Sequence, residues 1–94
     1  MYAVVRQYQF DPKHATEIDR KIQEGFVGLL QKSPGFIAYY WVDTGEGKGA
    51  SMSVFETLEE ADNSVLIAAD FVREHLAHLL GRPEVFHGEV KAYG

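Results

Sequence analysis

Residues 34–56, PGFIAYYWVDTGEGKGASMSVFE, decide the fold of this chain. Two apolar stretches, Phe36–Val42 and Ala50–Phe55, flank a short polar loop that contains Gly45 and Gly47. Val, Ile, Tyr, Phe and Trp favour a pleated, half-buried surface, and glycine supplies the turn conformations. The stretch therefore predicts a β-hairpin, and the rest of the chain is arranged around it.

A helix is predicted on either side of the hairpin. The first begins after the N-cap Asp11, with Pro12 at the first helical position, and ends near Lys32. The second is predicted over Leu58–Leu80 and begins after the N-cap Thr57, the first residue of a capping box. Apolar residues recur three and four positions apart in both, so each helix has one face that packs against a core.

Alternating side chains predict two further strands, Tyr2–Phe10 and Val85–Tyr93. The resulting order, β-α-β-β-α-β with two right-handed crossovers, is the ferredoxin-like arrangement. We therefore expect an α+β fold with a four-stranded antiparallel sheet and both helices on one face. At 94 residues the chain is expected to form a single domain, residues 1–94.

Composition excludes several classes of protein. The net charge is -5 and no basic run is present, so we expect no nucleic-acid partner. No apolar stretch approaches the ~18 residues that span a membrane, and we expect neither a membrane partner nor a signal peptide. The chain has no Cys, which removes disulfides and Cys-based zinc sites and favours a cytoplasmic location.

Alternation also divides the hairpin into two faces. We assign the smaller apolar residues to the helix-covered face: Ala38, Val42, Ala50, Met52 and Val54. The aromatic and hydroxyl side chains are assigned to the open face: Tyr39, Trp41, Ser51, Ser53 and Phe55. A bulge or a one-residue slip would invert this assignment. An exposed aromatic face predicts a homodimer that pairs through the open face of the sheet.

The whole chain resembles the antibiotic biosynthesis monooxygenase-like (ABM-like) proteins of the dimeric α+β barrel superfamily. The residues that carry the resemblance are Pro34-Gly35-Phe36, Val54–Ala61, Phe71–Leu76, Pro83–Val85 and Gly88–Val90. The resemblance implies the same dimeric fold. It leaves the chemistry open, because the superfamily includes cofactor-free quinone-forming oxygenases, haem-degrading enzymes, isomerases and members without known activity.

Haem degradation does not carry over to this sequence. The haem-degrading relatives use an Asn on the first strand, a Trp near the second helix and an axial His. Here the first strand has Arg6 and Gln7, and no Trp follows Trp41. His75 and His78 lie three residues apart on the second helix but lack a third ligand at metal-binding spacing. We therefore predict no haem, no metal and no other cofactor.

The catalytic candidates are His87 and His75. Cofactor-free oxygenases of this type deprotonate a phenol-like substrate inside an aromatic pocket, and a base with a pKa near the working pH suits that step. His87 shares a strand face with Glu89, whose carboxylate would raise the pKa of the imidazole. The alternative is a solvated His-Glu pair on an edge strand. His14, in the first helical turn, is expected to be a surface residue.

The predicted ligand-binding residues are polar or aromatic side chains of the strands: Arg6, Tyr8, Tyr39, Trp41, Ser51, Ser53 and Glu89. A half-buried Arg6 needs either a carboxylate partner, for which Glu89 is the candidate, or an anionic ligand. Tyr39 and Trp41 fit a dimer interface as well as a ligand pocket.

Two hypotheses about function follow. The first is a dimeric enzyme that binds a small apolar or aromatic metabolite and oxidises it without a cofactor. The second is a non-catalytic dimerisation or ligand-binding module. A polar-lined cavity favours the first, and an interior filled by side chains favours the second.

Overall fold

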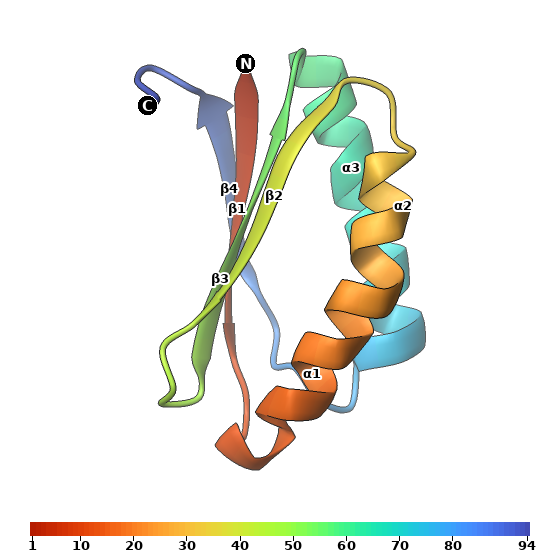
Figure 1. Ribbon diagram of the computed structural model, residues 1–94, viewed down its shortest axis with the longest axis vertical. Helices are drawn as coiled ribbons and strands as arrows, with labels where there is room; N and C mark the ends of the chain where they lie inside the picture. Colours follow the sequence, from red (N-terminus) through yellow and green to blue (C-terminus); the bar gives the residue numbers. More distant parts are fainter.

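The computed structural model describes residues 1–94 and contains one four-stranded sheet with helices on one of its faces (Figure 1). The strands are β1 (Tyr2–Gln9), β2 (Phe36–Asp43), β3 (Lys48–Phe55) and β4 (Glu84–Glu89). Their spatial order is β2-β3-β1-β4, and all neighbouring pairs are antiparallel. The predicted ferredoxin-like α+β fold is therefore confirmed, with β2 and β4 as the edge strands.

Two helical regions connect the strands. The first consists of the 3-10 turn η1 (Pro12–His14), α1 (Ala15–Lys21), η2 (Ile22–Phe26) and α2 (Val27–Gln31), and the second of α3 (Leu58–Phe71) and η3 (Val72–Leu76). Both predicted N-caps are present. The Asp11 carboxylate accepts a hydrogen bond from the Lys13 amide at 3.1 Å, and the Thr57 hydroxyl accepts one from the Glu60 amide at 3.2 Å.

The segments η2 and η3 are π-helical, so each holds one residue more per turn than the α-helix around it. The two helical regions approach closely beside them. A Cβ atom at Gly25 would lie 3.0 Å from two ring carbons of Phe71, so glycine is what permits this approach. Single-turn π segments of this kind occur frequently at functional sites.

The strand faces are the reverse of those predicted. Phe55 is completely buried, Ser51 and Ser53 are buried, and all three lie on the helix-covered side. Tyr39 and Trp41 also pack against the core. The smaller residues Ala38, Val42, Ala50, Met52 and Val54 occupy the open face, opposite to their assignment. The reason is volume, because long aromatic side chains are needed to fill the space between the sheet and the helices.

A bulge at the start of β2 complicates its alternation. Phe36 lies opposite Phe55, whereas Ala38 lies opposite Val54, so Ile37 is the extra residue. Phe36 consequently packs against the core, its ring centroid 6.0 Å from that of Phe55, and so does Tyr39 three residues later. Alternation is regular beyond the bulge.

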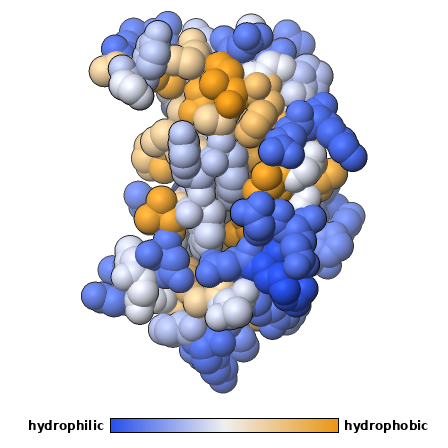
Figure 2. Space-filling model, in the orientation of Figure 1, coloured by the Kyte–Doolittle hydropathy of each residue, from blue (hydrophilic) through white to orange (hydrophobic).

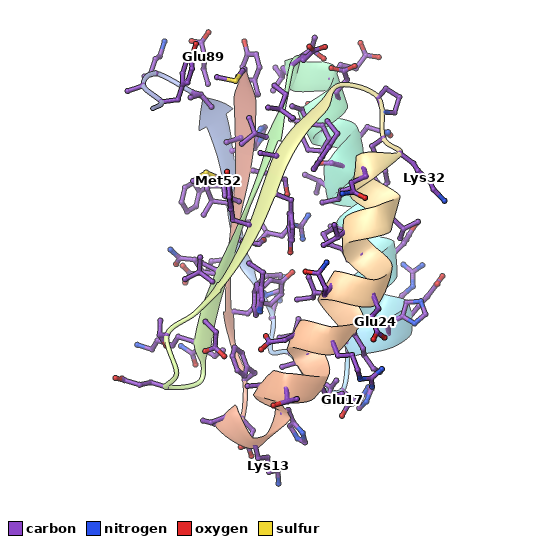
Figure 3. All side chains as sticks on the ribbon, in the orientation of Figure 1. Lys13, Glu17, Glu24, Lys32, Met52 and Glu89 are labelled. Atoms are coloured by element: carbon purple, nitrogen blue, oxygen red, sulfur yellow. The ribbon has the colours of Figure 1, made fainter.

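Cross-strand pairing arranges one residue from each strand into rows. The outer row, on the open face, consists of Tyr40, Met52, Val5 and Phe86. The inner row, on the helix-covered face, consists of Trp41, Ser51, Arg6 and Val85. Figure 3 shows Met52 directed away from the helices.

The outer row is an exposed apolar surface. Tyr40 is 61%, Phe86 55% and Met52 43% exposed. In Figure 2 apolar residues reach the surface on the side of the sheet that has no helix, while hydrophilic residues cover α1. The core lies between sheet and helices, where Val4, Ile18, Leu30, Phe55 and Leu76 are the largest fully buried side chains. None of the helices combines the length and the apolar character that crossing a membrane requires.

Candidate functional site

A small space, here called the inner gap, lies between the sheet and the helices. Its volume is about 20 Å³, which is room for about one water molecule. The strands contribute Arg6, Tyr8, Tyr39, Trp41 and Ser51, and the helical regions and the loop after them contribute Ile22, Phe26, Ala68, Val72, Leu76 and Leu80. The π segments η2 and η3 therefore supply four of the apolar wall residues.

A larger depression, the outer groove, adjoins the inner gap. It runs between the first helical region and edge strand β2, which face each other in Figure 1, and has a volume of about 600 Å³. Its lining residues are Asp19, Arg20, Ile22, Gln23, Glu24, Val27, Tyr39 and Trp41. Ile22, Tyr39 and Trp41 line both spaces, so these three side chains separate the groove from the gap.

Trp41 links the edge strand to the first helix. Its indole Nε1 donates a hydrogen bond to Asp19 Oδ1 at 2.9 Å. Its ring centroid lies 6.1 Å from that of Tyr8 in an edge-to-face arrangement. Gly49 on β3 makes room for the indole, because a Cβ atom there would lie 2.5 Å from Trp41 Cη2. The indole is thereby held between β2 and α1, where it lines the groove.

Tyr39 is the second residue of this boundary. Its ring packs edge-on against Phe26, with centroids 5.3 Å apart. Burial raises the pKa of the Tyr39 phenol well above its usual value, while hydrogen bonding to Ser51 and the positive charge of Arg6 lower it only partly. Tyr39 is consequently a neutral hydroxyl group at physiological pH.

Arg6 is the one charged side chain that lines the inner gap. It is only 6% exposed, and its Nη2 donates a hydrogen bond to the Val65 carbonyl at 3.3 Å. No carboxylate forms an ion pair with it. The prediction that Glu89 pairs with Arg6 is wrong. Glu89 lies opposite Tyr2 and forms an ion pair with Lys91, and the β4 residue opposite Arg6 is Val85.

The other predicted residues lie outside the inner gap. Ser53 is buried on the same sheet face, opposite Tyr39. His87 Nδ1 lies 3.5 Å from Asp62 Oδ1, so its carboxylate neighbour comes from α3 instead of being Glu89. The exposed His75 ring packs on Phe71, with centroids 4.7 Å apart. The catalytic roles of His87 and His75 stay predictions.

Sequence reasoning missed the helical half of the gap. Ile22, Phe26 and Leu76 follow the three- and four-residue spacing of apolar residues in the two predicted helices. That spacing indicates burial but does not distinguish a filled core from the wall of a cavity. No signal in the sequence connects Asp19 with Trp41, whose indole donates to it. No three His, Cys, Asp or Glu side chains cluster in a way that could hold a metal ion.

Comparison with known protein families finds one match. The model of the family described as antibiotic biosynthesis monooxygenase matches residues 1–65. No curated protein matches the sequence significantly.

Solved structures share the fold at low sequence identity. A protein of unknown function from Nitrosomonas europaea, NE2512, has a TM-score of 0.82 and 17% identity, over 99% of this chain and 91% of that one. The monooxygenase from the gene ActVA-Orf6 of Streptomyces coelicolor, solved with the ligand nanaomycin D, has a TM-score of 0.76 and 16% identity, over 98% and 88% of the two chains. The haem degrader MhuD from Mycobacterium tuberculosis has a TM-score of 0.72 and 13% identity, over 100% and 99%.

Proposed function

This chain belongs to the antibiotic biosynthesis monooxygenase family, and on that premise we propose that it binds a small aromatic metabolite at the outer groove and inner gap. The observation that carries the proposal is the position of Tyr39 and Trp41, which line both spaces and offer aromatic surfaces to a planar ligand. Apolar walls with a few polar groups are the usual composition of a small-molecule site. A similar fold in a monooxygenase solved with nanaomycin D supports an aromatic ligand.

The reaction that fits this family membership is oxidation without a cofactor. A phenol with an unsubstituted para carbon and O₂ give a para-quinone and water, so the balance requires no external reductant. One oxygen atom enters the ring and the other leaves as water. Within the proposed site, Arg6 would stabilise the phenolate that must form before oxygen can react, since an adjacent cation favours the charged form of an acid.

Binding is tested by thermal-shift measurements with 1-naphthol, and with cyclohexanol as a non-aromatic control. We expect 1-naphthol alone to raise the melting temperature. Tyr39→Ala and Trp41→Ala should remove that increase, whereas His14→Ala and His87→Ala should retain it, because neither His lines the gap or the groove. An equal response to both compounds, or none, would contradict the proposal.

The alternative of a non-catalytic ligand-binding or dimerisation module also has an observation in its favour. No His or carboxylate side chain lines the inner gap, so a general base within it is absent. An oxygen electrode separates the two functions. Uptake of O₂ with 1-naphthol, together with quinone absorbance, supports the oxygenase, and tight binding without O₂ uptake supports the module.

The proposal includes assembly as a homodimer through the open face. Its basis differs from the predicted one, since the exposed apolar side chains are Tyr40, Met52 and Phe86 of the outer row. Soluble monomers rarely expose such contiguous apolar surface. Sedimentation velocity at micromolar concentration should show a dimer that Met52→Asp converts to monomers. Leu66→Asp is the matched control, because Leu66 is a 66% exposed apolar residue of α3 on the other side of the molecule.

A further inference from the structure

The inner gap does not admit a molecule much larger than water. Its volume is about 20 Å³. A cavity that takes up benzene measures about 150 Å³. The outer groove beside the gap measures about 600 Å³, and the side chains of Ile22, Tyr39 and Trp41 line both spaces. The two spaces can therefore serve one aromatic ligand only after one of these side chains has moved.

Two of the three side chains are held by the core. Ile22 is 6% exposed and belongs to the buried core cluster. The Tyr39 ring packs edge-on against Phe26, with centroids 5.3 Å apart. The hydroxyl end of Tyr39 is buried as well, which is why the pKa of its phenol is raised. Moving either side chain would open a void in a closely packed interior.

Trp41 is held less firmly, although it also contacts the core. The ring centroids of Tyr8 and Phe10 lie 6.1 and 6.2 Å from that of the indole, towards the long end of the range for favourable ring pairs. The polar end of Trp41 faces outward, because the hydrogen bond of its Nε1 is exposed to solvent. β2 is an edge strand, so no further strand lies beyond the indole.

The surface beneath the indole lacks a side chain at Gly49. A Cβ atom there would lie 2.5 Å from Cη2 and 2.8 Å from Cζ2 of Trp41, so the benzo ring rests on bare backbone of β3. Bare backbone gives the ring a contact surface but no group that interlocks with it. The indole can therefore change its rotamer without passing a side chain at this position.

A single hydrogen bond joins the indole to the helix opposite. Its Nε1 donates to Asp19 Oδ1 at 2.9 Å, which connects β2 with α1. Asp19 forms no ion pair, so its carboxylate has no second side-chain partner. Loss of one hydrogen bond of this kind changes an equilibrium by about two- to tenfold. Asp19 is thus in a position to decide how often the indole leaves the gap.

We propose that the Trp41 indole is a gate between the outer groove and the inner gap, and that Asp19 is the positioning residue that keeps it shut. With the bond intact, the indole separates the groove from Arg6, Tyr8 and Ser51 of the gap. When the bond opens, the indole turns outward and the two spaces become one site. This inference rests on the proposed function and concerns the regulation of access to that site. Elements that open and close in this way often set the rates at which ligands enter and leave.

The experiment measures rates of binding, because a gate changes rates and leaves affinity alone. Stopped-flow mixing with 1-naphthol, followed through the fluorescence of the naphthol, gives the association and dissociation rate constants. Asp19→Ala should raise both by the same factor, about two- to tenfold, since the bond closes the site with and without ligand. The Kd should not change, whereas loss of a ligand contact would raise it.

Trp41→Phe tests the other partner of the bond. It keeps an aromatic ring but lacks the N–H donor, so it should raise both rate constants as Asp19→Ala does. Combining the two substitutions should add nothing further. Circular dichroism establishes that each variant is folded, and Trp41→Phe decides the question should Asp19→Ala fail to fold.

Two controls separate the bond from the charge of Asp19. Glu24→Ala removes another acidic side chain that lines the groove, and its rates should equal those of the native protein. Asp19→Asn keeps an oxygen acceptor and should lie between the native protein and Asp19→Ala. Solvent exchange of the indole N–H reports the bond without ligand, because Trp41 is the single Trp of the chain. Asp19→Ala should speed this exchange, and Glu24→Ala should not.

The outcomes separate the gate from the proposed function. Binding of 1-naphthol with unchanged rates in Asp19→Ala and Trp41→Phe would overturn the gate and leave the aromatic site standing. A change in Kd without equal changes in both rates would assign the two residues to ligand contact, and would overturn the gate as well. Failure of 1-naphthol to bind any of these proteins would overturn the proposed function, and the gate with it.

Discussion

Tyr40 and Trp41 are consecutive residues of β2, yet they belong to opposite surfaces of the sheet. Tyr40 is 61% exposed in the outer row, whose members are all apolar or aromatic. Trp41 packs against the core in the inner row, beside Ser51 and the charged Arg6. In these two rows the polar residues, Arg6 and Ser51, lie on the covered face, whereas the outer row contains only apolar or aromatic residues. Hydrophobicity alone therefore assigns the faces of this sheet wrongly, because buried polar and exposed apolar residues both occur.

The largest expected difference between the two faces concerns phenylalanine. Phe55→Ala on the covered face should lower the free energy of unfolding by about 3–5 kcal/mol, since it removes a completely buried ring and leaves a cavity. Phe86→Ala on the open face should change it by at most about 0.5 kcal/mol. Urea denaturation measures both, in a Met52→Asp background that disrupts the proposed dimer. Equal losses would contradict the assignment of the faces.

Glycine provides a second matched pair. A Cβ atom at Gly49 would lie 2.5 Å from Trp41 Cη2, whereas a Cβ atom at Gly88 would have no neighbour within 4 Å. Gly49→Ala should therefore cost about 1–3 kcal/mol through overpacking. It should also shift the fluorescence of Trp41, the single Trp of the chain. Gly88→Ala should leave both stability and fluorescence nearly unchanged; a silent Gly49→Ala would show that the indole lies elsewhere.

Alkaline pH should weaken the covered face through Tyr39. Burial raises the pKa of its phenol in the folded chain, while the unfolded chain loses that proton near pH 10. The unfolded state then binds fewer protons, so stability is unaffected below pH 10 and falls above it, by up to about 1.4 kcal/mol per pH unit. Denaturation at pH 9 to 11 should show this decline reduced in Tyr39→Phe. Tyr93→Phe, which removes an exposed tyrosine, is the control and should follow the native protein.

The smallest expected effect concerns the bond between Asp19 and Trp41. Asp19→Ala should cost about 0.5–1.5 kcal/mol, because the bond is exposed to solvent. A double-mutant cycle with Trp41→Phe isolates the pair. Glu24→Ala, which removes a surface ion pair on the same helical region, should show no coupling with Trp41→Phe. Coupling of equal size in both cycles would contradict a specific role for the indole.

The sequence predicted the positions of the helices and strands better than it predicted which face of each strand the helices cover. Capping residues at Asp11 and Thr57 and alternation in the strands are local signals, and they located both helices and all four strands within a few residues. The last strand ends at Glu89 and not at Tyr93, and the second helical region ends at Leu76, because packing decides where an element stops. The π segments have no local signal that distinguishes them from an α-helix.

Part of the candidate site was predicted, but on the wrong face of the sheet. Arg6, Tyr8, Tyr39, Trp41 and Ser51 do line one space, because strand residues two apart share a face. The alternation of side chains along a strand does not tell which face of the sheet the helices cover. The predicted residues therefore share a face, but it is the helix-covered face and not the open one. The helical wall, including Phe26, depends on how two distant segments pack, which periodicity cannot supply.

The bulge at Ile37 also affects how readily copies of this protein can aggregate through the edge strand β2. β2 is an edge strand, and from Phe36 to Val42 it contains no charged residue, no Pro and no Gly. Uncharged segments of high β-propensity at a free edge are templates for aggregation. An irregular start shortens the flat stretch that another chain could extend, and the charged Asp43 closes its other end. The same irregularity that obscures the faces of β2 therefore helps to keep copies of this protein from joining strand to strand.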